Sequence, residues 1–401
     1  MIYLHVPFCE SRCTYCGFFS SVILGVAQRS KKNLCLKAYA DAVCREVDER
    51  REEIANTLST NTLYIGGGTP SVLPLSILSR IIHSIALPPA GGSPSAGAAF
   101  DAPWSEFTIE VNPEDIVEKG EEYVRGLLGL GVNRISMGVQ SFDDGILRWM
   151  NRRHDSAAAE EAFRILRRCG VRNISIDLIF GLPPLSEALW SETVDRALEL
   201  GPEHISAYQL SVEEGSTLDR LASQGKFTEA TEEQCREQYD MLCARLGKAG
   251  YNHYEVSNFA VPGHEAIHNS AYWRRVPYVG LGPGAHSLSA GSVRSWNSEV
   301  IPRLSADGAL ETYSIEKEFL TPEDIRVERI MLSLRTARGI SATELRTLAG
   351  GQAVDRLLAE GALVRCHPER CPEPVEGRSG GSLRIPEDHF FTSDDIIRSL
   401  I

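Results

Sequence analysis

The sequence predicts an α/β protein whose main part is an incomplete parallel (β/α)6 barrel, followed by a C-terminal winged-helix-like module. From residue 2 to about residue 250, short β-branched runs alternate with amphipathic helical stretches. Repeated strand–helix alternation indicates parallel strands joined by right-handed crossovers. The chain has 401 residues, 43% of them hydrophobic, so it can bury the core of one large domain and a smaller one. A doubly wound open sheet shares this periodicity and remains the alternative.

The predicted elements follow one another in regular order. Strands are expected at residues 2–6, 62–65, 107–111, 134–139, 173–180 and 204–210. Helices are expected at residues 38–55, 113–130, 157–169, 187–200 and 232–249. Residues 87–105 are rich in Pro, Gly and Ala, which predicts a flexible surface insertion without chemistry. We therefore expect a barrel over residues 1–250 and a barrel extension over residues 251–320.

The remaining residues, 321–401, carry the signals of the C-terminal module. Thr321 precedes a proline and two acids, which predicts a helix start, and Ser341-Ala-Thr-Glu344 predicts a capping box. A third helix is expected over residues 352–360, ended by Gly361, with two short strands flanking the loop at residues 371–381. Winged helices often bind DNA. Residues 321–401 contain 11 Arg, no Lys and 13 acidic residues, and this net negative charge favours a packing role over DNA binding.

Composition excludes several classes of function. The net charge of −13 argues against nucleic-acid binding, which requires a basic surface. No apolar run is long enough to span a membrane, and the sequence begins in a strand-like run without a targeting segment. We expect a cytoplasmic protein, and peripheral contact with a membrane surface stays open.

Three cysteines near the start of the chain, Cys9, Cys13 and Cys16, have the spacing C-x3-C-x2-C. Thiolates are the usual ligands of iron–sulfur clusters. Three thiolates on one loop can hold three irons of a cubane and leave the fourth open for chemistry. A zinc site would need a fourth ligand, for which His5 is the local candidate. A disulfide with one spare thiol is the other alternative, and ten cysteines without a secretory signal speak against it.

Polar and glycine-rich segments follow the other predicted strands. Gly66-Gly-Gly-Thr-Pro-Ser71 follows the second strand, Glu110 ends the third, Gln140 follows the fourth and Asp177 lies on the fifth. In a parallel barrel the ligand binds at the carboxyl ends of the strands. These groups and the three thiols are therefore expected to meet on one rim.

Several motifs together resemble one branch of the radical S-adenosylmethionine (radical SAM) family, which contains oxygen-independent coproporphyrinogen III oxidase and a heme chaperone. They are Tyr3-x-His-x-Pro-Phe-Cys9, Gly66–Ser71, Arg134-Ile-Ser-Met-Gly-Val-Gln140-Ser-Phe142 and Ile176-Asp177-Leu-Ile-Phe-Gly181-Leu-Pro183. The resemblance implies that the three cysteines bind a 4Fe–4S cluster. It further implies contacts with S-adenosylmethionine by Tyr3, Gly67, Gly68, Thr69, Glu110, Gln140, Arg152 and Asp177.

Three differences favour the chaperone over the oxidase. Phe18 stands where the oxidase has a fourth cysteine, the oxidase's long extension before the first strand is missing, and His268-Asn269-Ser-Ala-Tyr272-Trp273 resembles the chaperone's H-N-x-x-Y-W motif. The resemblance then implies heme binding and transfer to an acceptor protein, plausibly a respiratory-chain component. The alternative is radical oxidative decarboxylation of coproporphyrinogen propionates, which would need an electron donor.

The heme site itself is the least defined prediction. Imidazole is a common axial ligand of heme iron, and aromatic rings can pack on a porphyrin face. His264, His268 and His286 are the candidate ligands, and the basic run from Arg152 to His154 is a candidate for propionate binding. The other cysteines are expected to be structural, except that Cys366 and Cys371 could form a metal clip.

Overall fold

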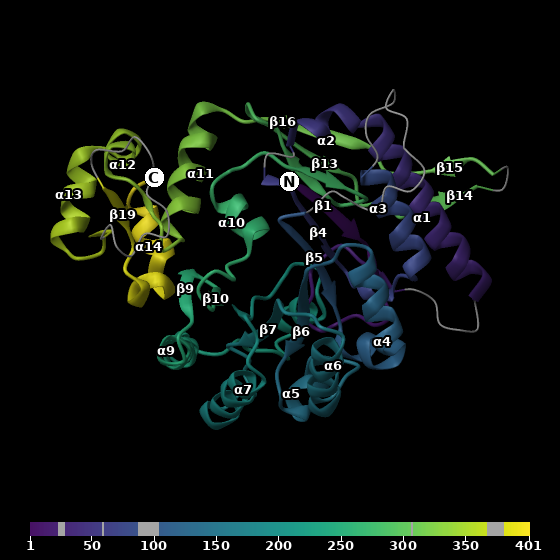
Figure 1. Cartoon of the computed structure of the whole chain (residues 1–401). Helices are drawn as coiled ribbons and strands as arrows, with labels where there is room; N and C mark the ends of the chain where they lie inside the picture. The colour runs from purple at the N-terminus through teal and green to yellow at the C-terminus, as the bar shows by residue number, and fades with distance from the viewer. Residues whose placement is uncertain (23–28, 58–59, 87–103, 306–307, 367–380) are drawn as a thin grey trace.

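The main sheet of the protein is built around six parallel strands. The computed structural model describes residues 1–22, 29–57, 60–86, 104–305, 308–366 and 381–401. Within these residues, nine strands form one sheet in the order β11-β1-β4-β5-β6-β7-β8-β10-β9 (Figure 1). The six central strands are β1 (Ile2–Val6), β4 (Thr62–Gly67), β5 (Glu106–Val111), β6 (Arg134–Gln140), β7 (Ile174–Phe180) and β8 (His204–Gln209).

The order of these strands decides between the two predicted architectures. From β1 to β8 the spatial order follows the chain order, and every neighbouring pair is parallel. A doubly wound sheet reverses its order at a switch point, whereas this sheet winds in one direction. Its edges carry β11 (Val279–Leu281) on one side, and β10 (Asn258–Ala260) and β9 (Asn252–Glu255) on the other. The predicted incomplete barrel is confirmed.

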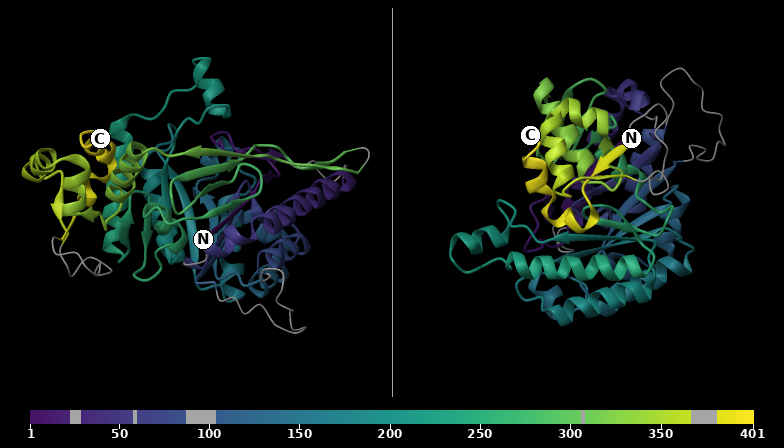
Figure 2. Two further views of the ribbon diagram at one scale, coloured as in Figure 1. Left: turned by 90° about the horizontal axis from the view of Figure 1, so that it is seen from above. Right: turned by 90° about the vertical axis from the view of Figure 1, so that its left-hand side faces the viewer.

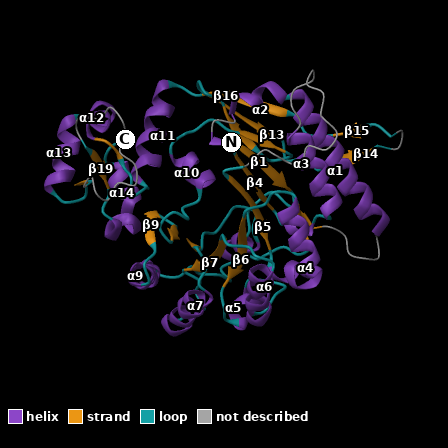
Figure 3. Ribbon diagram, in the orientation of Figure 1, coloured by secondary structure: helices purple, strands orange, loops and turns teal. Residues whose placement is uncertain are grey.

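Helices surround the sheet, and most of them lie on its outer face (Figure 3). In chain order they are α1 (Arg29–Glu49), α2 (Arg51–Thr57), α3 (Leu75–Ala86), α4 (Pro113–Gly129), α5 (Asp144–Trp149), α6 (Ser156–Arg168), α7 (Glu187–Leu200), α8 (Thr217–Ser223) and α9 (Glu232–Lys248). The α3 helix was not predicted. Its buried residues Leu78, Ile81, Ile82 and Ile85 have the helical i, i+3, i+4, i+7 spacing, so the signal for this helix was present in the sequence.

Residues after 250 complete the barrel and extend it. Besides β9, β10 and β11 they form α10 (Ile267–Trp273) and a three-stranded sheet of β12 (His286–Leu288), β13 (Val293–Asn297) and β16 (Ile315–Phe319). A short hairpin of β14 (Arg303–Leu304) and β15 (Leu310–Glu311) projects beside α1 (Figure 2). The extension therefore shares the barrel's sheet.

A separate C-terminal module lies beside the barrel, on the side of α10 and β9 (Figure 1). It contains α11 (Pro322–Leu334), β17 (Ile340–Ser341), α12 (Ala342–Ala349), α13 (Gly351–Ala359), β18 (Val364–Arg365), β19 (Ser382–Arg384), a 3-10 turn (Glu387–Thr392) and α14 (Ser393–Arg398). The order helix, strand, helix, helix, strand, strand is that expected of a winged-helix-like module.

The predicted helix caps have different outcomes. Thr321 forms a full capping box with Asp324 at the start of α11. The box predicted at Ser341 is wrong, because the Ser341 side chain makes no cap hydrogen bond and Glu344 pairs with Arg329 instead. Most of the predicted insertion (87–103) and most of the C-terminal loop with Cys371 lie outside the described residues. In the described part, no helix is long and apolar enough to cross a membrane.

Candidate functional site

The cysteine loop lies over the carboxyl ends of the barrel strands. Cys9 ends the short strand β2 (Phe8–Cys9), which pairs with β3 (Ser21–Val22). Thr14 N donates to the Met150 carbonyl 3.1 Å away, which ties the loop to the segment after α5. All three thiols line one cavity of about 500 Å³. The predicted convergence of cysteines and strand ends is therefore present.

The arrangement of the thiols bears on the kind of metal site. In the described residues, no three His, Cys, Asp or Glu side chains surround a point as ligands of a single ion would. A structural zinc site needs such a closed tetrahedral set, whereas a cubane takes one thiolate for each iron and places the sulfurs farther apart. Burial raises the pKa of Cys9 and raises that of Cys16 to about 11, so metal binding must displace protons from these thiols.

The glycine turn after β4 is fixed by close contacts. A Cβ on Gly67 would lie 2.6 Å from the His5 ring, and the φ of Gly67 is +112°. A Cβ on Gly68 would lie 2.7 Å from the Phe8 carbonyl oxygen. The backbone can therefore pass this close to the cysteine loop, and to any ligand beneath it, only without side chains.

Glu110 lies below this turn with both carboxylate oxygens bonded. The Tyr64 hydroxyl donates to one oxygen at 2.8 Å and Gly67 N donates to the other at 3.1 Å. Burial raises the pKa of Glu110 to about 7, and the neighbouring Asp177 acts in the same direction. A cationic amine placed here would favour the ionised form of Glu110.

Arg152 connects the cysteine loop to two strands. Its guanidinium donates to the Cys13 sulfur at 3.4 Å, to the Asn112 side chain at 2.7 Å and to the Gly138 carbonyl at 2.9 Å. Asn112 donates in turn to Thr69, whose hydroxyl donates to the Cys9 sulfur at 3.4 Å. One chain of polar contacts thus runs from one predicted cluster ligand to another.

Of the other predicted cofactor residues, Gln140 and Asp177 line the cavity and Tyr3 does not. Ser136 donates to Asp177 at 3.2 Å. Gln140 has a φ of +67°, a strained conformation for a residue with a side chain. Tyr3 does not line the cavity, and its hydroxyl contacts His5 Nδ1 at 3.1 Å.

Sequence reasoning missed several residues deeper in the barrel. These are Tyr64, Asn112, Arg134, Ser136, Ser206 and Tyr208, all of which line the cavity. On β6 the polar or small residues occupy alternate positions at 134, 136, 138 and 140. A strand with one polar face inside a barrel has this pattern, which was available in the sequence.

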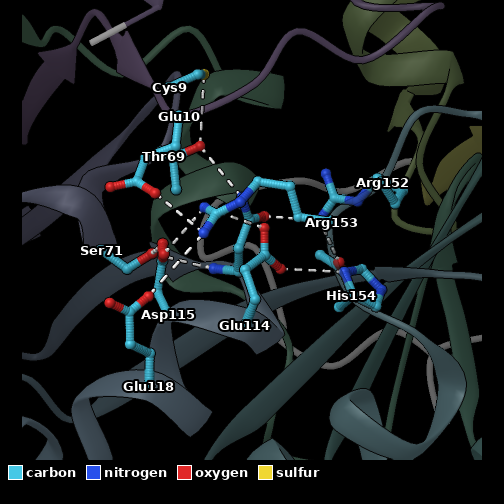
Figure 4. A network of polar contacts seen from close by, with 12 residues as sticks. Cys9, Glu10, Thr69, Ser71, Glu114, Asp115, Glu118, Arg152, Arg153 and His154 are labelled. Atoms are coloured by element: carbon cyan, nitrogen blue, oxygen red, sulfur yellow. Dashed lines mark hydrogen bonds and ion pairs between the residues drawn. The ribbon is translucent and has the colours of Figure 1, made fainter. Parts of the chain in front are cut away.

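The basic run after α5 is not free to bind propionates. Arg152 is committed to the cysteine loop, and His154 is buried, with its ring contacting Glu114 and the Val139 carbonyl. Arg153 lies within 4.0 Å of four carboxylates, those of Glu10, Glu114, Asp115 and Glu118 (Figure 4). These side chains are therefore engaged with groups around the cysteine loop, which argues against the prediction that the run binds propionates.

The H-N-x-x-Y-W motif forms α10, which closes the floor of the barrel. His268 has no exposed surface, and its ring nitrogens contact the hydroxyls of Thr62 at 2.9 Å and Tyr272 at 3.0 Å. Burial lowers the pKa of His268 to about 3, so the ring is neutral. With both nitrogens bonded, His268 holds no free position for iron in this conformation.

Residues on the two faces of α10 line two different cavities. Asn269 lines the barrel cavity that contains the cysteines. Ile267, Ser270 and Trp273 line a second cleft of about 1450 Å³ between the barrel and the C-terminal module. Tyr272 packs edge-on against Tyr278, with ring centroids 4.7 Å apart. The helix thus forms the partition between the two cavities.

Comparison with known proteins places the chain in a family. Residues 3–197 match the model of the Radical SAM superfamily. The chain is 32% identical to the heme chaperone HemW of Synechocystis sp. over 86% of its own length and 79% of that protein. It is 30% identical to HemW of Mycobacterium tuberculosis over 94% of its length and 91% of that protein. The chain belongs to the HemW family of the radical SAM superfamily.

A solved structure gives the fold of the HemW-family chain independent support. Coproporphyrinogen III oxidase (HemN) from Escherichia coli superposes with a TM-score of 0.74 at 20% identity, over 100% of this chain and 89% of that one. Membership of the radical SAM superfamily implies a 4Fe–4S cluster and S-adenosylmethionine. The donor set fits both groups, since three free thiols meet a bare glycine turn and buried carboxylates in one cavity.

Proposed function

We propose that this protein is a heme chaperone that binds a 4Fe–4S cluster, S-adenosylmethionine and heme, and passes the heme to an acceptor protein. The observation that carries the proposal is identity of 30% or more to heme chaperones named HemW over most of the chain. Phe18 gives additional support. It stands at the position of the oxidase's fourth cysteine and is 70% exposed beside the cavity mouth.

In this proposal Cys9, Cys13 and Cys16 hold the cluster, and the glycine turn and Glu110 receive the amine of S-adenosylmethionine. Gln140 and Asp177 lie farther along the same cavity, where they would meet the ribose. When bound, the cluster supplies an open iron and, if reduced, one electron. Arg152 holds the loop by its contact with Cys13 and places a positive charge next to the cluster sulfurs.

For heme we propose the second cleft, not the barrel cavity. A porphyrin needs a large, partly apolar slot with a few polar groups. The cleft offers Trp273 and Ile267 from α10, and Arg329 from α11, whose guanidinium is paired with Glu344. We propose His264 as the axial ligand: its own side chain is not among the residues that line the cleft, but its neighbours Gly263 and Glu265 are.

The test begins with anaerobic cluster reconstitution followed by titration with hemin. We expect a shifted Soret band at one heme per chain, and weakened heme binding in W273A and H264A. H268Q should reduce stability by about 1–3 kcal/mol, because Thr62 and Tyr272 each lose a buried partner, while the Soret position stays unchanged. A chain that binds no hemin at stoichiometric concentration would contradict the proposal.

A second assay separates transfer from catalysis. Heme-loaded protein is mixed with an apo-cytochrome, and movement of heme is followed by its spectrum. Incubation of the reduced protein with coproporphyrinogen III is the parallel reaction. Heme transfer without decarboxylation supports a chaperone, whereas accumulation of protoporphyrinogen would establish the oxidase activity instead.

A further inference from the structure

Arg134 is a buried cation without a partner. It is the first residue of β6, its exposed fraction is 1%, and it lines the barrel cavity. In the described part of the chain its guanidinium makes no hydrogen bond and no ion pair within 4.0 Å, and its buried Nε is unsatisfied. Buried guanidinium groups are normally paired, because leaving them unpaired costs free energy.

Other unsatisfied or open polar groups lie at the same depth. Thr108, the register partner of Arg134 on β5, is fully buried and its hydroxyl also lacks a partner. Asn269 of α10 lines the same cavity, and Tyr208, near the carboxyl end of β8 and 43% exposed, lines it closer to the mouth. Polar groups therefore lie near the Arg134 guanidinium at the floor of the barrel.

The acids of the cavity do not satisfy this cation. Glu110 is held by Tyr64 and by Gly67 N, and Asp177 is held by Ser136. Neither lies within ion-pair distance of Arg134 in the described structure. Both are the groups that the proposed function assigns to S-adenosylmethionine, which would bring its own positive charge to them.

Depth along β6 separates Arg134 from the cysteine loop. Gly138, which binds Arg152 through its carbonyl, lies four residues farther along the strand. At about 3.3 Å per residue this corresponds to roughly 13 Å. The backbone of Arg134 therefore lies well below the cysteine loop, and its charge reaches Glu110 and Asp177, where it opposes the rise in pKa that burial causes.

We propose that Arg134 forms a carboxylate-binding subsite at the floor of the barrel, for a carboxylate-bearing organic molecule. A planar guanidinium pairs with a carboxylate through two parallel hydrogen bonds, and Tyr208 adds a hydroxyl to the lining of the same cavity. The subsite goes beyond heme transport and does not require that the chain carry heme. The carboxylate can come from a small free acid, which agrees with heme in the second cleft, or from a porphyrin propionate, which would place the heme in the barrel cavity instead and contradict the proposed heme site.

The first experiment uses the full chain and small probes. Thermal unfolding is followed with sodium propionate and with propionamide at equal ionic strength, for wild type, R134Q and the surface control R164Q on α6. We expect propionate, but not propionamide, to raise the unfolding midpoint of wild type and R164Q, and to leave R134Q unchanged. Equal responses to propionate and propionamide in wild type, or a response retained in R134Q, would overturn the proposal.

If R134Q does not fold, R134K takes its place, since it keeps the charge but loses the two-pronged geometry. Its propionate response should be weaker than that of wild type, and an undiminished response would overturn the proposal.

Hemin and hemin dimethyl ester distinguish the source of the carboxylate. If a propionate enters the subsite, the ester should bind wild type about tenfold more weakly, and R134Q should remove that difference. If hemin and its ester bind equally while propionate still acts through Arg134, the ligand is a small free acid. If wild type does not bind hemin at all, the proposed heme function is contradicted, whereas the carboxylate-binding subsite is still tested by propionate.

Discussion

At the scale of single residues, Gly67 is the most constrained position of the site. It has a left-handed φ, and a Cβ at this position would lie only 2.6 Å from the His5 ring. Neither constraint involves chemistry directly. Both bring the turn after β4 close enough to the cysteine loop for Gly68 N and Thr69 N to bond with its backbone.

We predict that G67A lowers stability by about 2–4 kcal/mol through backbone strain and overpacking and also weakens S-adenosylmethionine binding. Calorimetric titration and chemical denaturation measure the two effects. G120A is the matched control, because Gly120 also has a positive φ but meets nothing within 4 Å of a Cβ. That variant should lose about 1–3 kcal/mol and bind the cofactor as wild type does. Unchanged binding by G67A would refute the role of the turn.

Glu110 gives a prediction about pH. Its pKa is about 7 in the folded chain, above the ordinary value of 4.5, chiefly through burial. The folded state therefore holds a proton that the unfolded state releases, so stability is highest below pH 4.5 for this group and falls as the pH rises to 7. In E110Q the slope of unfolding free energy against pH should be less negative by up to about 1.4 kcal/mol per unit.

Denaturation of the apo protein between pH 5 and 7 checks this. E49Q, at the exposed end of α1, is the control and should keep the wild-type slope. Burial also raises the pKa of Asp177 and of Glu255, so part of the slope should survive in E110Q. Identical slopes in E110Q and wild type would show that Glu110 does not titrate in this range.

At the scale of elements, the cysteine loop is held by contacts that come from several parts of the barrel. Arg153 follows α5, Glu10 belongs to the loop, and Asp115 and Glu114 begin α4 (Figure 4). Asp115 also accepts from Ser71 at the end of the glycine turn, 2.6 Å away. The loop is thus positioned by the acids that begin α4, by the arginine that follows α5 and by the Ser71 hydroxyl of the glycine turn.

R153Q should therefore leave the fold intact but hold the cluster less firmly. We expect iron to be lost to a chelator several-fold faster than from wild type, and the difference to shrink at high salt because part of the network is exposed. R164Q, which breaks exposed ion pairs on α6, should release iron at the wild-type rate. If R153Q and wild type lose iron to the chelator at the same rate, the ion-pair network does not help to hold the cluster.

At the scale of the whole molecule, the C-terminal module is joined to the barrel by backbone pairing and by one ionic hub. Val256 N donates to the Arg335 carbonyl and Ala337 N donates to the Tyr254 carbonyl. Glu328 of α11 pairs with Arg275 at 2.8 Å and with Arg294 of β13. Of these residues, Tyr254 and Ala337 also line the second cleft.

E328Q should loosen this junction and cost about 1–3 kcal/mol, since Arg275 loses its carboxylate partner and Arg294 keeps only Glu318 among the described residues. Hydrogen exchange should show α11 amides opening sooner while β5 to β7 stay protected, and hemin affinity should fall. E323Q, whose ion pair with Arg326 lies on the exposed side of the same helix, should change the free energy of unfolding much less than E328Q. If the α11 amides exchange at the same rate in E328Q and E323Q, Glu328 does not hold the C-terminal module to the barrel.

The sequence by itself determined the six parallel strands, because their β-branched runs are bounded by glycine and polar turns, and α7 begins and ends as its periodicity predicts. It also determined the cysteine loop and the strand-end residues, since ligands of a barrel follow its strands. The spacing of residues along a chain does not show which side chains contact each other in the folded protein. Only the tertiary structure decided that Arg153 is neutralised by acids, that His268 is buried with both nitrogens bonded, and that Arg134 has no partner. Each depends on side chains that come from distant strands and meet inside the barrel.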